Sequence, residues 1–254
     1  MSAVRADALP APVARWLRQA FPDGIPEVHT LEVVGSASVR LGAVPPLRVS
    51  VRMSHRLGRD HVADIRLRVG GLTALAVMDA YVDGRGLAKI GPWASVGPDI
   101  DQAALLSTWG EAVLLPSAWR RLPAVSFESI DPASVRLALP AAADAPVLAT
   151  LTFDPASGPP SAFEAQRYKG TTGRLVGWRG EYLDWRTIDG LPFPGRWLVS
   201  WADESRPWFD MTIAHLRADA PIDNALHRAR RAIEHAAEHS NRGLDGQDAE
   251  VRRS

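Results

Sequence analysis

The sequence predicts a mainly β protein of the α+β class, built on a strongly curved antiparallel sheet that forms an unclosed or half barrel. The first observation is the alternation of apolar and polar residues along most of the chain, interrupted by turns rich in Gly, Pro and Asp. This pattern is typical of antiparallel strands joined by short loops. The second is the number of such runs, because a sheet of more than about ten strands curls, splits or closes. The third is the presence of three helical segments that can cover the sheet.

The first expected element is a short N-terminal helix that begins after Pro10. Its apolar residues recur at helical spacing, at Val13, Trp16, Leu17 and Ala20. The segment Phe21-Pro-Asp-Gly24 is expected to end this helix. Since an apolar stripe needs a surface to pack on, we expect this helix to cover the sheet.

Strands are expected on both sides of a central helix. The clearest alternation lies in residues 47–54, where Val49, Val51 and Met53 share one face. Asp83-Gly84 and Asp189-Gly190 favour hairpin turns. The other strands are expected at 31–41, 65–69, 72–82, 125–130, 135–139, 147–153, 163–168, 178–185, 197–201 and 209–216.

The central helix is expected from Pro98 to Pro116, which stops or bends it. Asp99 or Asp101 can cap its first turn. Its apolar stripe consists of Leu105, Leu106, Trp109, Ala112 and Val113.

The domain prediction is a single half-barrel domain over residues 1–220, followed by an amphipathic C-terminal helix over 221–240. Residues 241–254 have no apolar period and are expected to be a disordered tail. We expect the fold not to need this helix and tail.

Composition excludes several classes of protein. The 254-residue chain has 29 Lys+Arg and 29 Asp+Glu, and its formal net charge of +0 gives no field that attracts nucleic acid or an anionic membrane. It has no Cys, which excludes disulfides, thiolate metal sites and a Cys nucleophile. No stretch approaches the ~20 apolar residues of a membrane span. Because the N-terminus lacks the pattern of a signal peptide, we expect a cytoplasmic protein.

Six landmarks follow one another along the chain: Leu9–Leu17, Asp79–Gly86, Glu111–Ala118, Ala165–Tyr168, Trp178 and Asp189–Pro194. In this order they resemble a family of uncharacterised bacterial proteins, a domain of unknown function. That family is similar to the unclosed half-barrels of the LolA, LolB and LppX lipoprotein carriers, a likeness that rests on strand order and the Asp-Gly hairpins. The resemblance implies a concave apolar cavity that holds acyl chains. Because no signal-peptide pattern is found, we expect the chain to differ from the periplasmic carriers in this respect.

Tryptophan is abundant, with nine residues in the chain. Large rings can fill the inside of a wide half-barrel as core, or line a pocket for an apolar ligand and offer it one N–H group. The candidate ligand-binding residues are Trp109, Trp119, Tyr168, Trp178, Trp197 and Trp201.

Glu111 stands in an otherwise apolar helical run. It either faces solvent or is buried, and a buried carboxylate needs a partner, for which Arg167 is the expected residue. Asp79 and Tyr81 share one strand face and can join this pair. If the chain is an enzyme, these four residues are the candidate catalytic groups for proton transfer and orientation. A Glu–Arg pair can equally be structural.

Two histidine patterns resemble metal sites. His235-Ala-Ala-Glu-His239 matches the H-x-x-E-H pattern of zinc peptidases, but it lies at the end of the chain. His55 and His61 flank a polar hairpin connection, which we interpret as a surface loop. We therefore expect no metal and no cofactor, and the sequence lacks the G-x-S-x-G, P-loop and G-x-G-x-x-G motifs.

The leading hypothesis is a protein that binds a mostly apolar small molecule or acyl chain in an aromatic-lined cavity. The alternative is a cofactor-independent enzyme, such as an isomerase, cyclase or lyase, that acts on a hydrophobic metabolite in the same cavity. A second alternative is a protein-interaction module that uses the C-terminal helix. The expected partner is thus an apolar or lipid-like ligand, without nucleic acid and without an integral membrane segment; the oligomeric state is left open.

Overall fold

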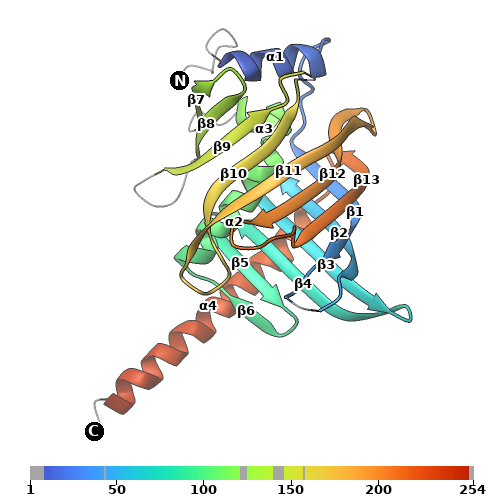
Figure 1. Cartoon of the computed structure of the whole chain (residues 1–254). Coiled ribbons are helices and arrows are strands. Elements are labelled where there is room, and N and C mark those ends of the chain that lie inside the picture. The colour runs from blue at the N-terminus through green and yellow to red at the C-terminus, as the bar shows by residue number, and fades with distance from the viewer. Residues whose placement is uncertain (1–8, 43, 121–124, 140–145, 157, 252–254) are drawn as a thin grey trace.

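The computed structural model describes residues 9–42, 44–120, 125–139, 146–156 and 158–251. In these residues, thirteen strands form one sheet in the order β6-β5-β4-β3-β2-β1-β13-β12-β11-β10-β9-β8-β7 (Figure 1). Strands β1 to β6 span Thr30–Val39, Leu47–Arg56, Asp60–Val69, Leu72–Val82, Arg85–Ile90 and Trp93–Ser95. Strands β7 to β13 span Ser126–Asp131, Ser134–Leu139, Val147–Phe153, Pro160–Tyr168, Leu175–Ile188, Leu191–Trp201 and Phe209–Ala218.

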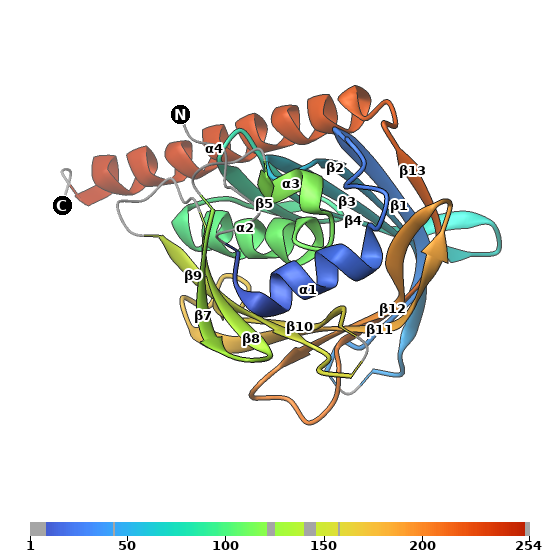
Figure 2. The same ribbon diagram turned by 90° about the horizontal axis from the view of Figure 1, so that it is seen from above.

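The sheet is antiparallel, and strands β6 and β7 are its two edges. Strand β1 pairs with β13, so the first and last strands meet in the middle of the sheet. Because β6 and β7 do not pair with each other in the described structure, the sheet curves without closing into a barrel (Figure 2). This confirms the predicted antiparallel, unclosed half-barrel.

Helices occupy the concave side of the sheet. Helices α2 (Pro98–Ala112) and α3 (Pro116–Arg120) connect edge strand β6 to edge strand β7, and lie beside α1 (Ala11–Ala20) inside the curve (Figure 2). Large buried side chains fill the space between the helices and the sheet, including Trp16, Trp109, Trp119, Phe153 and Phe163. The predicted cover by an N-terminal and a central helix is confirmed.

Helix α2 is buried on all sides, and not along a single stripe as the sequence predicted. Every residue in Ala103–Ala112 is buried, because α2 contacts β4 and β5 on one side and β10 on the other. Two glycines permit this packing. A Cβ atom on Gly86 would lie 2.4 Å from the backbone oxygen of Ile100, and one on Gly110 would lie 3.2 Å from the ring of Trp178.

The start of α2 differs from the sequence prediction. Its N-cap is Gly97, without a side-chain capping bond, and neither Asp99 nor Asp101 takes that position. The carboxylate of Asp101 instead accepts a hydrogen bond from the backbone N–H of Gly86 and ties the helix to β5. The predicted break at Pro116 is present, since this residue begins α3.

Helix α4 (Asp223–Val251) covers the opposite face of the sheet (Figure 2). It forms a second core with outward-facing residues of β3, β4 and β5, made of Val62, Ala80, Val82, Leu87, Ala220, Ile222, Ala225, Leu226, Ala229, Ile233 and Ala236. Ion pairs from Arg228 to Asp64 and from Arg230 to Asp83 accompany this contact. The helix supplies part of the core, so we no longer expect the fold to be independent of it.

The far end of α4 continues as helix through Val251, past residue 241, where the sequence predicted a disordered tail. This segment contains no Pro to end the helix, and it projects beyond the sheet (Figure 1). Residues 252–254 of the predicted tail lie outside the described residues. Neither α4 nor any other helix in the described ranges is both long and apolar enough to cross a membrane.

Both Asp-Gly dipeptides form hairpin turns as predicted. The φ angles of Asp83 and Gly84 are 51° and 81°, and those of Asp189 and Gly190 are 47° and 85°. A type I′ turn needs positive φ at both central residues. These turns join β4 to β5 and β11 to β12, and each of these pairs is antiparallel.

Candidate functional site

A small cavity of about 60 Å³ lies between the concave face of the sheet and α2. Most of its wall is apolar and consists of Met53, Ala63, Ile65, Trp178, Trp197, Val199, Trp208 and Phe209. The polar part of its wall consists of His61, Asp79, Ser107, Glu111 and Arg167. Among these residues Ile65, Asp79 and Trp208 are half-buried and the others are buried, so these three are the lining residues that reach solvent.

Helix α2 supplies part of the polar wall through its periodicity. Ala103, Ser107 and Glu111 follow one another at intervals of four residues, and therefore share one face of the helix. Arg167 of β10 binds the first two levels of this face. Its Nε donates to the carbonyl oxygen of Ala103 at 2.9 Å, and its Nη2 donates to Oγ of Ser107 at 3.0 Å.

Arg167 takes Asp79, and not Glu111, as its acidic partner. Its Nη2 lies 3.8 Å from the Asp79 carboxylate, and its guanidinium lies over the Trp178 ring at 5.1 Å from the centroid. Burial lowers the pKa of Arg167, and the charge of Asp79 opposes this shift. The expected Glu111–Arg167 pair is wrong, because α2 carries Glu111 one turn beyond the level that Arg167 binds.

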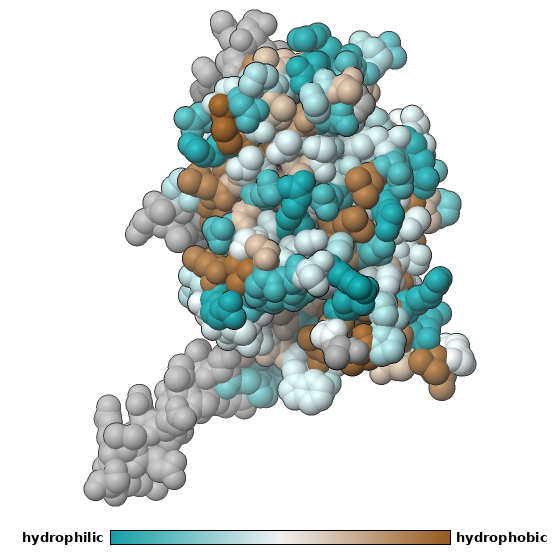
Figure 3. Space-filling model, viewed as in Figure 1, coloured by the Kyte–Doolittle hydropathy of each residue, from teal (hydrophilic) through white to brown (hydrophobic). Residues whose placement is uncertain are grey.

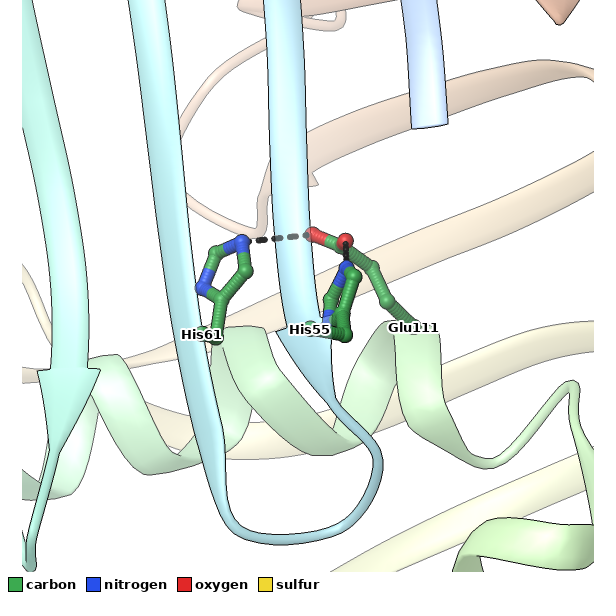
Figure 4. Close-up of side chains that lie close together, drawn as sticks. All are labelled: His55, His61 and Glu111. Carbon is green, nitrogen blue, oxygen red and sulfur yellow. Dashed lines mark ion pairs between the residues drawn. The ribbon is translucent and has the colours of Figure 1, made fainter. Parts of the chain in front are cut away.

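His55 and His61 face each other at the base of the β2–β3 hairpin. They are directly opposite in the strand register, and their rings stack with centroids 4.6 Å apart and 21° between planes. Each is only 1% exposed. The surface-loop interpretation is wrong, because β2 extends to Arg56 and β3 begins at Asp60. Both histidines therefore belong to strands, and they point toward α2 (Figure 4).

Glu111 reaches these histidines from α2 (Figure 4). Its Oε2 lies 2.5 Å from Nε2 of His55, and its Oε1 lies 3.6 Å from Nε2 of His61. Neither contact has hydrogen-bond geometry: within the described residues, all four ring nitrogens of the histidines and Oε2 of Glu111 lack a hydrogen-bond partner. The cluster therefore brings buried, unpaired polar atoms within 4.8 Å of one another.

Burial also determines the charge of the cluster. It lowers the pKa of His55 to about 3 and is the main cause of a pKa of about 4 for His61. It raises the pKa of Glu111 to about 7, an effect that His61 opposes. At neutral pH both imidazoles are uncharged, so the 2.5 Å contact is not an ion pair. A carboxyl group with such a pKa can give or accept a proton.

Of the two other candidate catalytic residues, only one lines the cavity. Asp79 lines it, as the sequence prediction required for a site residue. Tyr81 has the same strand parity, but it is buried in the main core outside the residues that line the cavity. Burial raises the pKa of Tyr81, as do the nearby charges of Asp101 and Asp60.

Only some of the predicted ligand-binding aromatic residues line the cavity. Trp178 and Trp197 line the cavity. Trp109 and Trp119 are buried in the core, and Tyr168 is half-buried at the end of β10; neither group belongs to the described lining.

Trp201 lies on an outer groove of about 450 Å³ over β8 to β12. Polar residues line this groove together with Trp178 and Trp201, and they include Arg136, Glu164 and Arg179. Figure 3 shows this face of the molecule, where hydrophilic residues lie among hydrophobic ones. The groove is thus an open, mixed surface and not an apolar pocket.

Sequence reasoning missed His55 and His61 as site residues, although strand parity marks both. His55 continues the buried positions Val49, Val51 and Met53 of β2, and His61 has the parity of Ala63 on β3. Ser107 and Phe209 were missed as well, although Ser107 precedes Glu111 by about one helical turn and Phe209 shares the strand parity of the buried Met211. The His235/His239 pair of the H-x-x-E-H match is exposed on α4, with ring centroids 4.2 Å apart.

The fold is similar to that of solved bacterial proteins. A LolA superfamily protein from Nitrosomonas europaea aligns with a TM-score of 0.51 at 12% identity, over 86% of this chain and 98% of that one. A DUF1329 family protein from Desulfovibrio piger aligns with a TM-score of 0.47 at 11% identity, over 84% of this chain and 95% of that one. The first likeness supports the half-barrel fold. No curated protein matches the chain.

Residues 1–211 match the family of unknown function DUF6544. This span contains the cavity and the His55, His61 and Glu111 cluster. The chain therefore belongs to the DUF6544 family.

Proposed function

We propose that the chain binds a mostly apolar small molecule, with one polar group, in the cavity beneath α2. The observation that carries this proposal is the division of the cavity wall into an apolar part and a polar part. Small-molecule sites commonly have this composition, in which apolar walls supply affinity and a few polar groups fix the orientation of the ligand.

Arg167 is the group best suited to orient the ligand. A guanidinium has five N–H donors, and the bonds to Ala103 and Ser107 leave donors for an acceptor on the ligand. The ring of Trp178 restrains the plane of the guanidinium. The polar group of the ligand is therefore a carboxylate or a carbonyl.

The size of the cavity limits the ligand. Its volume of about 60 Å³ is far below the roughly 300–1,000 Å³ of drug-sized sites. The described conformation thus admits a short apolar group, and a longer acyl chain requires the half-buried Ile65 and Trp208 to move outward. This requirement distinguishes the chain from a carrier with an open cavity.

Calorimetric titration of the full chain with butanoate, a carboxylate with a short apolar group, tests this proposal. The protein is first freed of metal with a chelator, so that the result does not depend on a metal ion. Ala63→Leu adds bulk to the cavity wall and should abolish binding, whereas Ala76→Leu at an exposed position of β4 should leave binding unchanged. Wild-type affinity in a correctly folded Ala63→Leu variant would contradict binding in the cavity. Native mass spectrometry of protein purified without detergent would identify the class of a retained ligand.

A second function, catalysis, is favoured by the presence of Glu111 and His61 in the wall of the same cavity. A carboxyl group and an imidazole beside an apolar metabolite can transfer protons, as an isomerase, cyclase or lyase requires. In an enzyme, Glu111→Gln would preserve ligand binding and lower turnover about 10²–10⁴-fold. The interaction-module hypothesis loses its main support, because the sheet covers the apolar stripe of α4.

A further inference from the structure

We propose that His55, His61 and Glu111 bind one divalent first-row transition metal ion, such as Zn²⁺. Two imidazoles and one carboxylate are a donor set that proteins use for zinc and for non-haem iron. One donor atom from each residue lies within 4.8 Å of the others. Ligand bonds of about 2.1 Å place tetrahedral donors roughly 3.4 Å apart, so small side-chain rotations bring all three onto one ion.

The fold positions the donors before any ion binds. The register of β2 and β3 sets His55 directly opposite His61, and α2 holds Glu111 against both (Figure 4). Both Nε2 atoms face the carboxylate in this arrangement. The three donors come from two rigid elements, a hairpin and a buried helix, and not from a loop.

The unpaired polar atoms are the independent observation that points to a ligand. His55, His61 and Glu111 are at most 6% exposed, and within the described residues both Nε2 atoms and Oε2 of Glu111 lack hydrogen-bond partners. Buried polar groups are normally paired. Direct hydrogen bonds do not fit the N···O distances of 2.5 and 3.6 Å, which lie on either side of the usual range of about 2.7–3.2 Å. An ion that takes both Nε2 lone pairs and a carboxylate oxygen satisfies these atoms together.

The charges near the cluster permit a cation. Arg167 lines the same cavity, but Asp79 at 3.8 Å offsets part of its charge. Glu111 then supplies the negative charge among the three ligands, and the imidazoles bind in their neutral form.

The site is of the open kind. Three protein ligands leave at least one position on a four-coordinate ion. His61 and Glu111 line the cavity, so this position faces a space large enough for a water molecule or an oxygen donor of a ligand. The metal would give the polar group of the ligand a second anchor beside Arg167. Only this last step rests on the proposed function.

Titration of metal-free protein with Co²⁺ tests the site without any assay of activity. The visible absorption of Co²⁺ reports its ligands, and Zn²⁺ is then added to displace it. We expect one equivalent to bind and the thermal midpoint to rise. Loss of an outer-shell partner lowers metal affinity by about 10–100-fold. Glu111→Gln and His61→Asn each remove a ligand of the ion, so each should lower metal affinity by more than this. The double variant His235→Ala/His239→Ala should bind like the wild type; loss of binding in that variant would place the ion on α4 and overturn the proposal.

X-ray absorption at the zinc edge of the wild-type protein needs no variant, and therefore decides the question even if a buried substitution prevents folding. We expect two imidazoles and oxygen donors around the ion. Fewer than two imidazoles, or no binding of either ion, overturns the proposal. Because butanoate binding is measured on metal-free protein, the two proposals can fail separately.

Discussion

Nη2 of Arg167 donates a hydrogen bond to Oγ of Ser107 at 3.0 Å, and this contact holds the guanidinium one helical turn before Glu111 on α2. The acidic partner of the arginine is Asp79 of β4, at 3.8 Å. The polar wall of the cavity thus contains two groups, Arg167 with Asp79 and Glu111 with the two histidines. Substitutions should affect these groups separately.

A double-mutant cycle tests this division. Arg167→Met leaves buried acceptors on α2 without a donor, so the free energy of unfolding should fall by about 3 kcal/mol. Asp79 has a side chain that is 34% exposed, and its loss should cost less. In urea unfolding, the coupling energy of Arg167→Met with Asp79→Asn should exceed that with Glu111→Gln.

The matched control for this cycle is Arg179→Met. Arg179 pairs with Glu164 on the outer face, and its side chain is 43% exposed, so the change should cost less than about 1 kcal/mol. Equal coupling of Arg167 to Asp79 and to Glu111 would show that the polar wall is one network.

Residue parity predicted much of the sheet, because the two faces of a strand alternate whatever its partner is. The alternation at 47–54 corresponds to β2, and the Asp-Gly dipeptides correspond to the expected turns. Strands β5 and β6 were not expected, since they are short and follow a turn closely. The pairing of β1 with β13 was beyond sequence reasoning, because it joins segments at opposite ends of the chain.

The site was less predictable than the sheet, because its contacts depend on how α2 sits against several strands. The sequence left open whether Glu111 is exposed or buried, and for a buried carboxylate Arg167 and His55 are both compatible partners. Which of the two residues contacts Glu111 depends on the turn of α2 against which each strand packs, and tertiary packing determines this. The polar residues between His55 and His61 favoured a loop, although the parity of His55 with Met53 already indicated an inward side chain.

Leu226→Ala should destabilise the fold by about 2–5 kcal/mol, the usual cost of a large cavity in a core. Leu226 of α4 is 0% exposed and lies against the outer face of β3 to β5. Thermal and urea unfolding measure the change. Leu148→Ala, at a position that is 53% exposed, is the control and should change stability by less than about 0.5 kcal/mol.

Truncation of the chain separates the two parts of α4. A chain that ends at Ser240 keeps the α4 residues of the second core, the last of which is Ala236, and should melt at nearly the wild-type temperature. A chain that ends at Asp219 exposes Val62, Val82 and Leu87 and should unfold many degrees lower. A large loss on truncation at Ser240 would show that the far end of the helix also supports the fold.

Gly86→Ala should destabilise the protein, although alanine suits a strand better than glycine. The added Cβ would lie 2.4 Å from the oxygen of Ile100 and 2.8 Å from the nitrogen of Asp101. Both are backbone atoms of α2, so the helix itself must shift, at a cost of about 1–3 kcal/mol. Urea unfolding measures this loss, and wild-type stability would show that α2 does not pack this closely on β5.

The ion pair between Asp83 and Arg230 should make the docking of α4 depend on pH. The hydrogen bond from Arg230 lowers the pKa of Asp83 below its ordinary 3.8; burial opposes this shift, and the charges of Arg230, Arg56 and Arg59 assist it. Because the pKa is lower in the folded state, the stabilisation is fully present well above pH 3.8 and is lost as the pH falls through the folded pKa. The effect should be small, since the Asp83 side chain is 50% exposed.

Comparison with Asp83→Asn isolates this contribution from other acid effects. Asparagine also tolerates the positive φ of the turn, and it resembles a protonated aspartate. The wild type should therefore be the more stable protein at pH 6, and the difference in urea unfolding should shrink as the pH falls through the folded pKa of Asp83. A difference that persists at low pH would show that the substitution acts through the β4–β5 turn, and not through the ion pair with α4.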